Sequence, residues 1–211
     1  MSLSFALRIS VAAIVTATAL VIAVPQSSSA QSPAPPASTP APAVTPDTPD
    51  QGAPDQPNGI FGVDTTLTAK PIVYVKGTGS WDDAFETISN AFKKLKAYTD
   101  KEGLKVDGLP MTIFTSTDDS GFDYEAALPL AAPPGTPPHG DIAVGQSPEG
   151  HALKFVHNGS YDDLDNTYEA ITNYLDEKRL DAQDMFIEEY VTDPTTSNQD
   201  KLTVNVYVLL K

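Results

Sequence analysis

The sequence predicts an α+β fold built from two copies of one strand-strand-helix-strand-strand unit, with eight mostly antiparallel strands and two main helices around a central cleft. The pentapeptide Gly-Ser-Trp-Asp-Asp at 79–83 recurs 80 residues later as Gly-Ser-Tyr-Asp-Asp at 159–163. Apolar residues then follow a helical stripe in each copy, at 81, 84, 88, 91 and 95 and at 161, 164, 168, 171 and 175. Each copy ends in a segment of alternating apolar residues, as in a half-buried strand. We therefore expect one duplicated domain over residues 59–211.

Both helices are expected to begin in the same way. Ser80 and Ser160 each stand three residues before an acid, Asp83 and Asp163 respectively. This spacing resembles a capping box, in which the hydroxyl accepts early backbone N–H groups and the acid favours the positive end of the helix.

Strands are expected on both sides of each helix. The Pro- and Gly-rich stretch 131–140 joins the two repeat units, which run from about 60 to 130 and from 141 to 211. Polar turns at 118–121 and 193–195 separate the last two strands of each unit. The expected strands are 61–68, 72–76, 111–115 and 122–130 in the first unit and 142–145, 152–157, 185–191 and 202–210 in the second.

The first 58 residues are expected to lie outside the folded domain. Residues 1–30 have the features of a secretory signal peptide, because an apolar run follows the single charge of Arg8 and small residues end at Ala30. Residues 31–58 form a Pro/Ala-rich linker that cannot bury enough apolar surface to fold. We therefore expect a periplasmic or secreted protein, tethered to the membrane if the signal is not cleaved.

The net charge and the absence of cysteine exclude several kinds of binding partner and site. The formal net charge is −15 at pH 7 and becomes −16 once Arg8 leaves with the signal. A strongly acidic chain repels nucleic acid, so no nucleic-acid partner is expected. The absence of cysteine excludes disulfides, Cys-ligated metals and a thiol nucleophile.

No metal or cofactor site is expected. His139, His151 and His157 lack the spacing of metal-binding motifs, and we expect them at the surface. The acidic turn at 118–123 lacks the alternating acids and the terminal Glu of a calcium-binding loop.

Residues from about 60 to 211 resemble the GyrI-like, or AraC-type effector-binding, small-molecule-binding domain. Four segments carry the resemblance in the expected order: 77–81, 122–130, 157–161 and 188–194. It implies two pseudo-symmetric units whose sheets form a concave cleft, which in that family binds amphipathic, often cationic molecules. Family members often follow a DNA-binding domain, but a signal and a linker stand in that place here. A role in transcription is therefore not expected.

The resemblance also implies that Glu188 binds the ligand. In the family, the carboxylate two residues before the strand tyrosine, here Tyr190, lies in the cleft. Strand alternation puts Phe186 on the same face. Glu189 is the rival, because a local bulge would exchange the directions of the two acids. A carboxylate among aromatic rings suits an organic cation.

The first unit is expected to contribute the opposite wall of the cleft. Ile113 aligns with Ile187, and both are expected to face the helices. Phe114, which aligns with Glu188, is then expected to face the cleft.

Further candidates for the ligand site come from the helix starts and the last strands. Trp81 and Tyr161 occupy the first turn of each helix, with an ordinary core role as the alternative. Glu125 adds negative charge on the last strand of the first unit, unless it serves only the solubility of the sheet. Asn205 stands where the family often carries an acid. The other helical aromatics are expected to serve packing alone: Phe85, Phe92, Tyr168 and Tyr174.

Three functions remain open. The first is an extracytoplasmic module that binds an amphipathic, cationic small molecule. The second is a hydrolase of reactive, cyclopropane-type compounds that uses the cleft glutamate. The third is an envelope protein-interaction module that uses the linker as its contact. We expect binding rather than catalysis.

Overall fold

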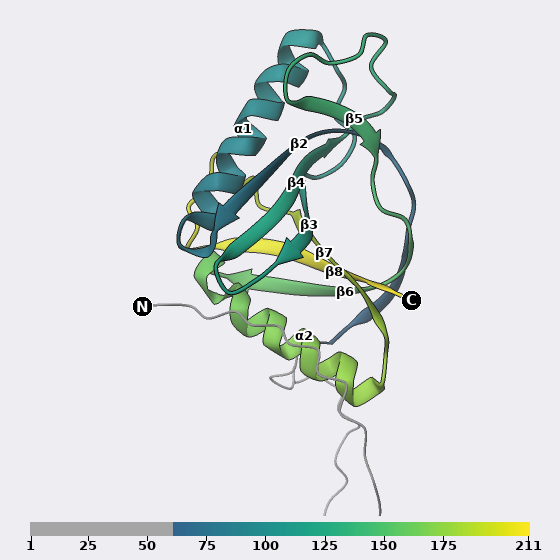
Figure 1. Cartoon of the computed structure of the whole chain (residues 1–211), viewed down its shortest axis with the longest axis vertical. Helices are drawn as coiled ribbons and strands as arrows, with labels where there is room; N and C mark the ends of the chain where they lie inside the picture. Colours follow the sequence, from purple (N-terminus) through teal and green to yellow (C-terminus); the bar gives the residue numbers. More distant parts are fainter. Residues whose placement is uncertain (1–60) are drawn as a thin grey trace, which may run out of the picture. The chain divides into compact units, whose positions relative to one another are not determined.

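The computed structural model describes residues 61–211, so the expected signal peptide and the whole expected linker lie outside the described residues. The described chain forms eight strands and two α-helices, as the sequence predicts (Figure 1). The strands form a single sheet, and a short 3₁₀ turn precedes each helix. In chain order the elements are β1 (Val63–Leu67), β2 (Pro71–Ser80), η1 (Trp81–Asp83), α1 (Ala84–Glu102), β3 (Met111–Thr117), β4 (Gly121–Pro129), β5 (Ile142–Gln146), β6 (Gly150–Gly159), η2 (Tyr161–Asp163), α2 (Leu164–Lys178), β7 (Ala182–Tyr190) and β8 (Leu202–Leu210).

The sheet order shows that the two units exchange their first strands. The order is β1-β6-β8-β7-β3-β4-β2-β5, and every pairing is antiparallel. Strand β1 of the first unit therefore pairs with β6 of the second, and β5 of the second pairs with β2 of the first. Neither half of the sheet is complete without a strand from the other unit.

The centre of the sheet is the junction of β3 and β7. Ile113 pairs with Ile187 there, Phe114 pairs with Phe186, and Thr112 pairs with Glu188. Residues that align between the units thus lie symmetrically about the Ile113–Ile187 pair. The junction brings one strand of each unit side by side, so a site at this point can draw on both.

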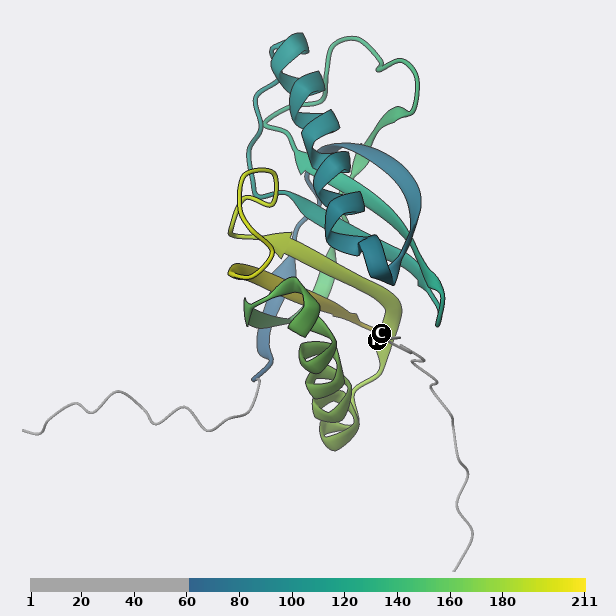
Figure 2. The ribbon, with the colours of Figure 1, turned by 90° about the vertical axis from the view of Figure 1, so that its left-hand side faces the viewer.

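Both helices cover the same face of the sheet (Figure 2). The main core lies beneath them and combines helix residues such as Ile88 and Ile171 with the alternating apolar residues of β4 and β8. Each α-helix follows a 3₁₀ turn and ends in a left-handed residue, Gly103 in α1 and Arg179 in α2. Neither helix of the described chain is both long and apolar enough to span a membrane.

The expected caps form only in part. The Ser160 side chain accepts a hydrogen bond from the Asp162 backbone N–H at 3.3 Å. The Ser80 side chain makes no capping bond, and Asp83 and Asp163 instead stand at the N-caps of the α-helices without side-chain caps. The reason is the extra 3₁₀ turn, which moves the start of each α-helix beyond the reach of the serine.

The prediction that the central isoleucines face the helices is wrong. Ile113 and Ile187 belong to a smaller apolar cluster on the sheet face that the helices leave uncovered, together with Ile72, Ala127, Ala152 and Leu209. Both faces of the central strands are buried, so alternation shows which residues share a face without showing which face the helices cover. Phe114 and Tyr190 pack in the core beneath the helices.

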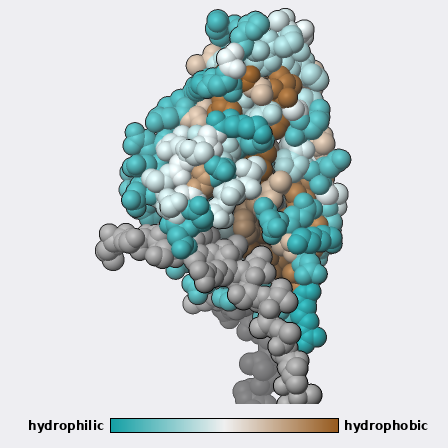
Figure 3. All heavy atoms as spheres, in the orientation of Figure 1, coloured by the Kyte–Doolittle hydropathy of each residue, from teal (hydrophilic) through white to brown (hydrophobic). Residues whose placement is uncertain are grey.

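Hydrophobic residues also reach the surface. In Figure 3 they appear between hydrophilic ones along the middle of the view, near β5 and over the strands below it. Val144 in β5 is 37% exposed. Strand β5 is one of the two edges of the sheet, so no further strand covers it in the described chain.

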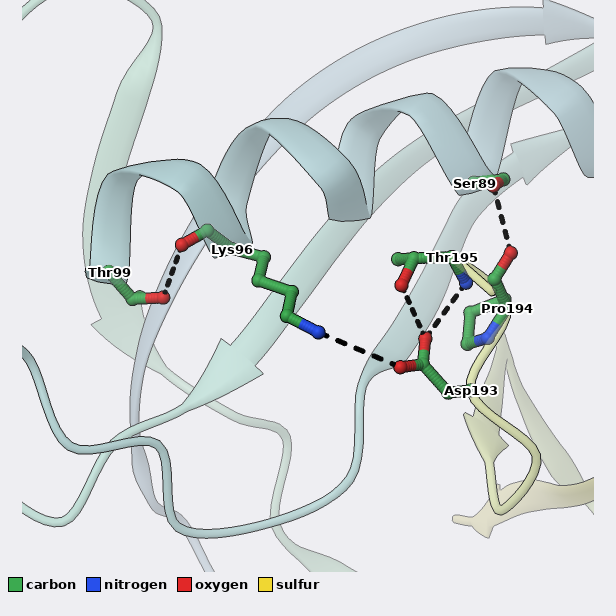
Figure 4. A network of polar contacts seen from close by, with 6 residues as sticks. All are labelled: Ser89, Lys96, Thr99, Asp193, Pro194 and Thr195. Atoms are coloured by element: carbon green, nitrogen blue, oxygen red, sulfur yellow. Dashed lines mark hydrogen bonds and ion pairs between the residues drawn. The ribbon is translucent and has the colours of Figure 1, made fainter. Parts of the chain in front are cut away.

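The loop between β7 and β8 fastens the second unit to helix α1 of the first (Figure 4). The buried Ser89 hydroxyl donates to the Pro194 carbonyl oxygen at 2.8 Å. Asp193 lies 3.8 Å from the Lys96 ammonium, and its carboxylate also accepts from the backbone N–H and hydroxyl of Thr195. This loop therefore adds a further connection between the units, beside the exchanged strands and the pairing of β3 with β7.

Replacing Ser89 by Ala is expected to lower the free energy of unfolding by about 1 kcal/mol, because the buried Pro194 carbonyl loses its donor. Urea unfolding of Ser89→Ala and of the control Asn90→Ala would measure this. Asn90 is exposed on the same helix and gains similar helix propensity on substitution. Equal stabilities of the two variants would contradict the inference.

Candidate functional site

A cavity of about 260 Å³ lies where the N-terminal ends of both helices meet the central strands β3 and β7. Both units contribute to its walls. Its lining residues are Trp81, Asp82, Ala84, Phe114, Thr117, Tyr161, Asp162, Leu164, Asp165, Tyr168, Phe186 and Glu188.

A β-bulge shapes one wall of the cavity. The pairing of β3 with β4 shifts its register between Phe114 and Ser116. Alternation would otherwise turn Thr117 to the opposite face from Phe114, yet both line the cavity. The bulge thus turns the end of β3 towards the cavity.

Glu188 in β7 is the buried acid of the cavity, and its side chain is 1% exposed. Three tyrosine hydroxyls donate hydrogen bonds to its carboxylate. The Tyr168 hydroxyl lies 2.7 Å from Oε1, and the hydroxyls of Tyr190 and Tyr161 lie 2.5 and 3.4 Å from Oε2. We call this arrangement of Tyr161, Tyr168 and Tyr190 the tyrosine cage.

Burial raises the pKa of Glu188 above its usual value, although the three hydrogen bonds from the tyrosine cage lower it. Burial and the neighbouring carboxylate raise the pKa of each cage tyrosine well above its usual value, so all three remain protonated donors at neutral pH. No lysine, arginine or histidine of the described chain forms an ion pair with Glu188. Ionised Glu188 is therefore a buried charge without a cationic partner.

Aromatic rings surround the remaining space. Trp81 stacks on Phe114 with a centroid distance of 6.4 Å, and its Nε1–H donates to the Asp118 carbonyl oxygen at 2.7 Å. Tyr168 meets Phe186 edge to face at 5.2 Å. These contacts fix the orientation of the rings, so the walls of the cavity are largely preformed.

Three further carboxylates line the cavity near the helix starts. Asp82 and Asp162 are exposed, and Asp165 is half-buried. The lining residues include no lysine, arginine or histidine. All ionisable side chains in the lining except the tyrosines are therefore acidic, and the cavity favours positive charge.

The structure brings five of the predicted ligand residues together. Glu188, Phe114, Trp81, Tyr161 and Phe186 all line the cavity.

Tyr190, another predicted ligand residue, lies behind Glu188 instead of in the wall of the cavity. It is fully buried, donates its hydroxyl to Glu188 and packs edge to face on Phe92 at 5.4 Å. Its contact with a ligand would therefore be indirect, through Glu188.

The remaining two predicted residues lie on the opposite face of the sheet. Glu125 forms an ion pair with Lys76 at 2.6 Å. Asn205 donates to the carboxylate of Glu189 at 2.8 Å. Both follow from strand alternation, because their neighbours along β4 and β8 point into the core beneath the helices. Glu189 also accepts from Tyr207, so this rival acid points away from the cavity.

Tyr168 is the site residue that the sequence reasoning missed, since it was assigned to packing alone. Its hydroxyl reaches Glu188, and its ring lines the cavity. A signal was present in the repeat. Tyr168 aligns with Ile88, so the second copy of the helical stripe carries a phenol where the first copy carries an aliphatic residue.

The expected surface position of one histidine is wrong. His157 is buried, whereas His139 is exposed and His151 contacts Asp64 at the surface. The ring of His157 finds two polar partners inside the protein, which compensates for its burial. Within residues 61–211, no group of three or more His, Asp or Glu side chains could hold a metal ion.

The raised pKa of Glu188 makes stability depend on pH. Because the folded-state pKa lies above the unfolded one, stability falls as the pH rises from 4.5, the usual value, through the raised pKa. Each pKa unit of difference corresponds to about 1.4 kcal/mol. We expect urea unfolding from pH 4 to pH 8 to show wild type losing stability relative to Glu188→Gln as the pH rises. A constant difference across this range would contradict the assignment.

Comparisons with known proteins agree with this architecture. Residues 65–211 match the GyrI-like small molecule binding domain. The fold is similar to an EcmrR–DNA complex solved by cryo-EM (TM-score 0.63, 12% identity, covering 74% of this chain and 59% of that chain). It is also similar to the EcmrR C-terminal domain (TM-score 0.57, 13% identity, covering 72% of this chain and 98% of that chain). A third similar structure is a hydrolase from Listeria innocua (TM-score 0.52, 13% identity, covering 74% of this chain and 94% of that chain).

These identities establish likeness of fold alone, and the chain spans 59% of the length of EcmrR in the complex. No curated protein matches the chain. The family match begins within β1 and extends to the last residue, and so includes the other seven strands, both helices and the cavity. The chain belongs to the family of the GyrI-like small-molecule-binding domain.

Proposed function

We propose that this domain binds an amphipathic organic cation in the cavity, with the positive charge at Glu188. The family supports a small-molecule ligand. The observation that supports the charge of that ligand is the buried carboxylate of Glu188, which has no cationic partner in the described chain. A bound cation would supply the missing positive charge.

The cavity walls add to this attraction. A cation over an aromatic face gains about 0.5–2 kcal/mol, more where water is excluded. Trp81, Phe114 and Phe186 offer apolar rings for the body of the ligand, and the rings of Tyr161 and Tyr168 lie next to the acid. A flat or bulky apolar group joined to a single charged centre fits this arrangement.

The hydrogen bonds of the tyrosine cage favour one kind of cation. Three hydroxyls already donate to Glu188, which occupies most of the acceptor positions of its carboxylate. A primary ammonium must find acceptors for three N–H groups, whereas a quaternary ammonium needs none. The site is therefore suited to quaternary or delocalised cations.

Binding is expected to follow the charge and the methylation of the ligand. Trp81 is the only tryptophan of the chain and lines the cavity, so its fluorescence should report occupancy. We expect benzyltrimethylammonium to bind at least about tenfold more tightly than benzylamine, which would lose roughly one hydrogen-bonding partner or more on burial. Glu188→Gln is expected to weaken binding of benzyltrimethylammonium by a similar factor or more.

Glu189→Gln is the matched control for this experiment. It removes the same charge one residue away, from a side chain on the opposite face of the sheet. Its affinity should equal that of wild type. Equal affinities of Glu188→Gln and Glu189→Gln for benzyltrimethylammonium would contradict the proposal. So would a failure of the wild-type protein to bind either benzyltrimethylammonium or benzylamine.

We also propose that the protein acts outside the cytoplasm. The support is the signal-like segment 1–30 and the Pro/Ala-rich linker 31–58. If the signal is retained, a linker of this composition would hold the domain away from the membrane. Fractionation of cells that express the full chain, with mass spectrometry of the N-terminus, tests this. Recovery only in the cytoplasm with residues 1–30 intact would contradict it.

A hydrolase is the second candidate function. It is favoured by the raised pKa of Glu188, which helps this acid to keep a proton for a leaving group inside an apolar cavity. A protein of similar fold is named a hydrolase. Product formation from a strained cyclopropane electrophile, lost in Glu188→Gln, would support this function, and equal background rates for both proteins would exclude it for that substrate.

A further inference from the structure

His157 connects the strand β6 to the start of helix α2. Its ring is 5% exposed and lies outside the lining of the cavity. The Nδ1 atom lies 2.8 Å from the Thr167 hydroxyl oxygen, and Nε2 lies 2.9 Å from the Ser160 carbonyl oxygen. Both ring nitrogens are therefore engaged.

The partners determine the direction of these hydrogen bonds. A carbonyl oxygen only accepts, so Nε2 carries a hydrogen and donates it to Ser160. In the neutral ring Nδ1 is then an acceptor, and the Thr167 hydroxyl donates to it. One imidazole thus fixes a backbone carbonyl ahead of η2 and a side chain in the first turn of α2.

Both partners of His157 directly precede a residue of the tyrosine cage. Ser160 precedes Tyr161, and Thr167 precedes Tyr168. The positions of these two backbone segments determine whether the two phenol hydroxyls reach the carboxylate of Glu188.

The first unit lacks this connection. The position that aligns with His157 is Gly77, where an added Cβ would lie 2.7 Å from the Tyr124 ring. The strand residue that pairs with His157 is Val204, which aligns with Tyr124. Each of these two aligned pairs therefore contains one ring. It is Tyr124 opposite Gly77 in the first unit and His157 opposite Val204 in the second. Only the unit that carries the tyrosine cage uses a ring with two hydrogen-bonding atoms.

We propose that His157 is a positioning residue for the ligand site, which holds Tyr161 and Tyr168 in hydrogen-bonding distance of Glu188. The consequence for ligand binding rests on the proposed function. The consequence for Glu188 itself does not, because the hydrogen bonds of the cage to the carboxylate involve only the protein's own side chains.

The test uses Thr167→Val, which removes the hydroxyl that donates to His157 and preserves the shape of the side chain. Carbon-13 NMR of the Glu188 carboxyl in the ligand-free protein would measure its pKa. Loss of the Tyr168 hydrogen bond, which lowers that pKa, is expected to raise it further. Thr167→Ser should restore the wild-type value. Thr87→Val is the matched control, because Thr87 aligns with Thr167 on helix α1 and should leave Glu188 unchanged.

Repeating the substitution in a variant without the two tyrosine hydroxyls distinguishes a positioning role of His157 from a general effect on the core. In Tyr161→Phe/Tyr168→Phe, the added Thr167→Val substitution should leave the pKa of Glu188 unchanged, since the hydroxyls that it positions are absent. In the otherwise wild-type protein, Thr167→Val should also weaken binding of benzyltrimethylammonium by about fivefold, the equivalent of one hydrogen bond.

The outcomes are distinct. A raised pKa without any binding of the cation supports the positioning role and contradicts the proposed function. A lower melting temperature with an unchanged Glu188 pKa in both Thr167→Val and His157→Gln overturns the positioning role. Should Thr167→Val fail to fold, Thr167→Ala provides the same comparison against Thr87→Ala.

Discussion

The site depends on the hydrogen bonds that three tyrosine hydroxyls donate to the buried carboxylate of Glu188. Ionisation of Glu188 in a nearly water-free position is costly, and the tyrosine cage reduces that cost without neutralising the charge. The hydroxyls come from η2, α2 and β7, so the cage forms only when helix and sheet are correctly packed. The fold thus places an acid inside an aromatic cavity, where no cationic side chain of the described residues pairs with it.

Duplication of the unit explains how such a site arises at the junction of two halves. Strands β3 and β7 meet at a symmetric pair, and the 3₁₀ turn before each helix begins with an aromatic residue at the cavity, Trp81 or Tyr161. The halves have nevertheless diverged. Phe114 stands in the first unit where Glu188 stands in the second, so one half supplies an apolar wall and the other supplies the charge. Exchange of β1 and β5 keeps the two halves in a fixed relation.

The duplicated pentapeptide showed the repeat, and the helical stripes and strand alternation were enough to predict the helix and strand content, because both of these patterns are local periodicities. The exchange of β1 and β5 was not predictable, since alternation defines faces and carries no information on strand partners. Glu125 was expected at the site because alternation shows which residues share a face without showing which face carries the cavity. Asn205 was expected there from the family resemblance. Both point away from the cavity. The roles of Tyr168 and His157 depend on hydrogen bonds between different elements, which helix and strand periodicity does not encode. For Tyr168, comparison of the two repeats offered a signal, because Ile88 stands at the aligned position.

The most direct test of this account is a crystal structure of the protein with 4-bromobenzyltrimethylammonium, whose bromine can be located by anomalous scattering. The account predicts the bromine inside the cavity, against the aromatic rings that line it at Trp81 and Phe114, and the ammonium nitrogen next to the carboxylate of Glu188. Bromine density elsewhere on the protein, with the cavity occupied by the protein's own side chains, would contradict it.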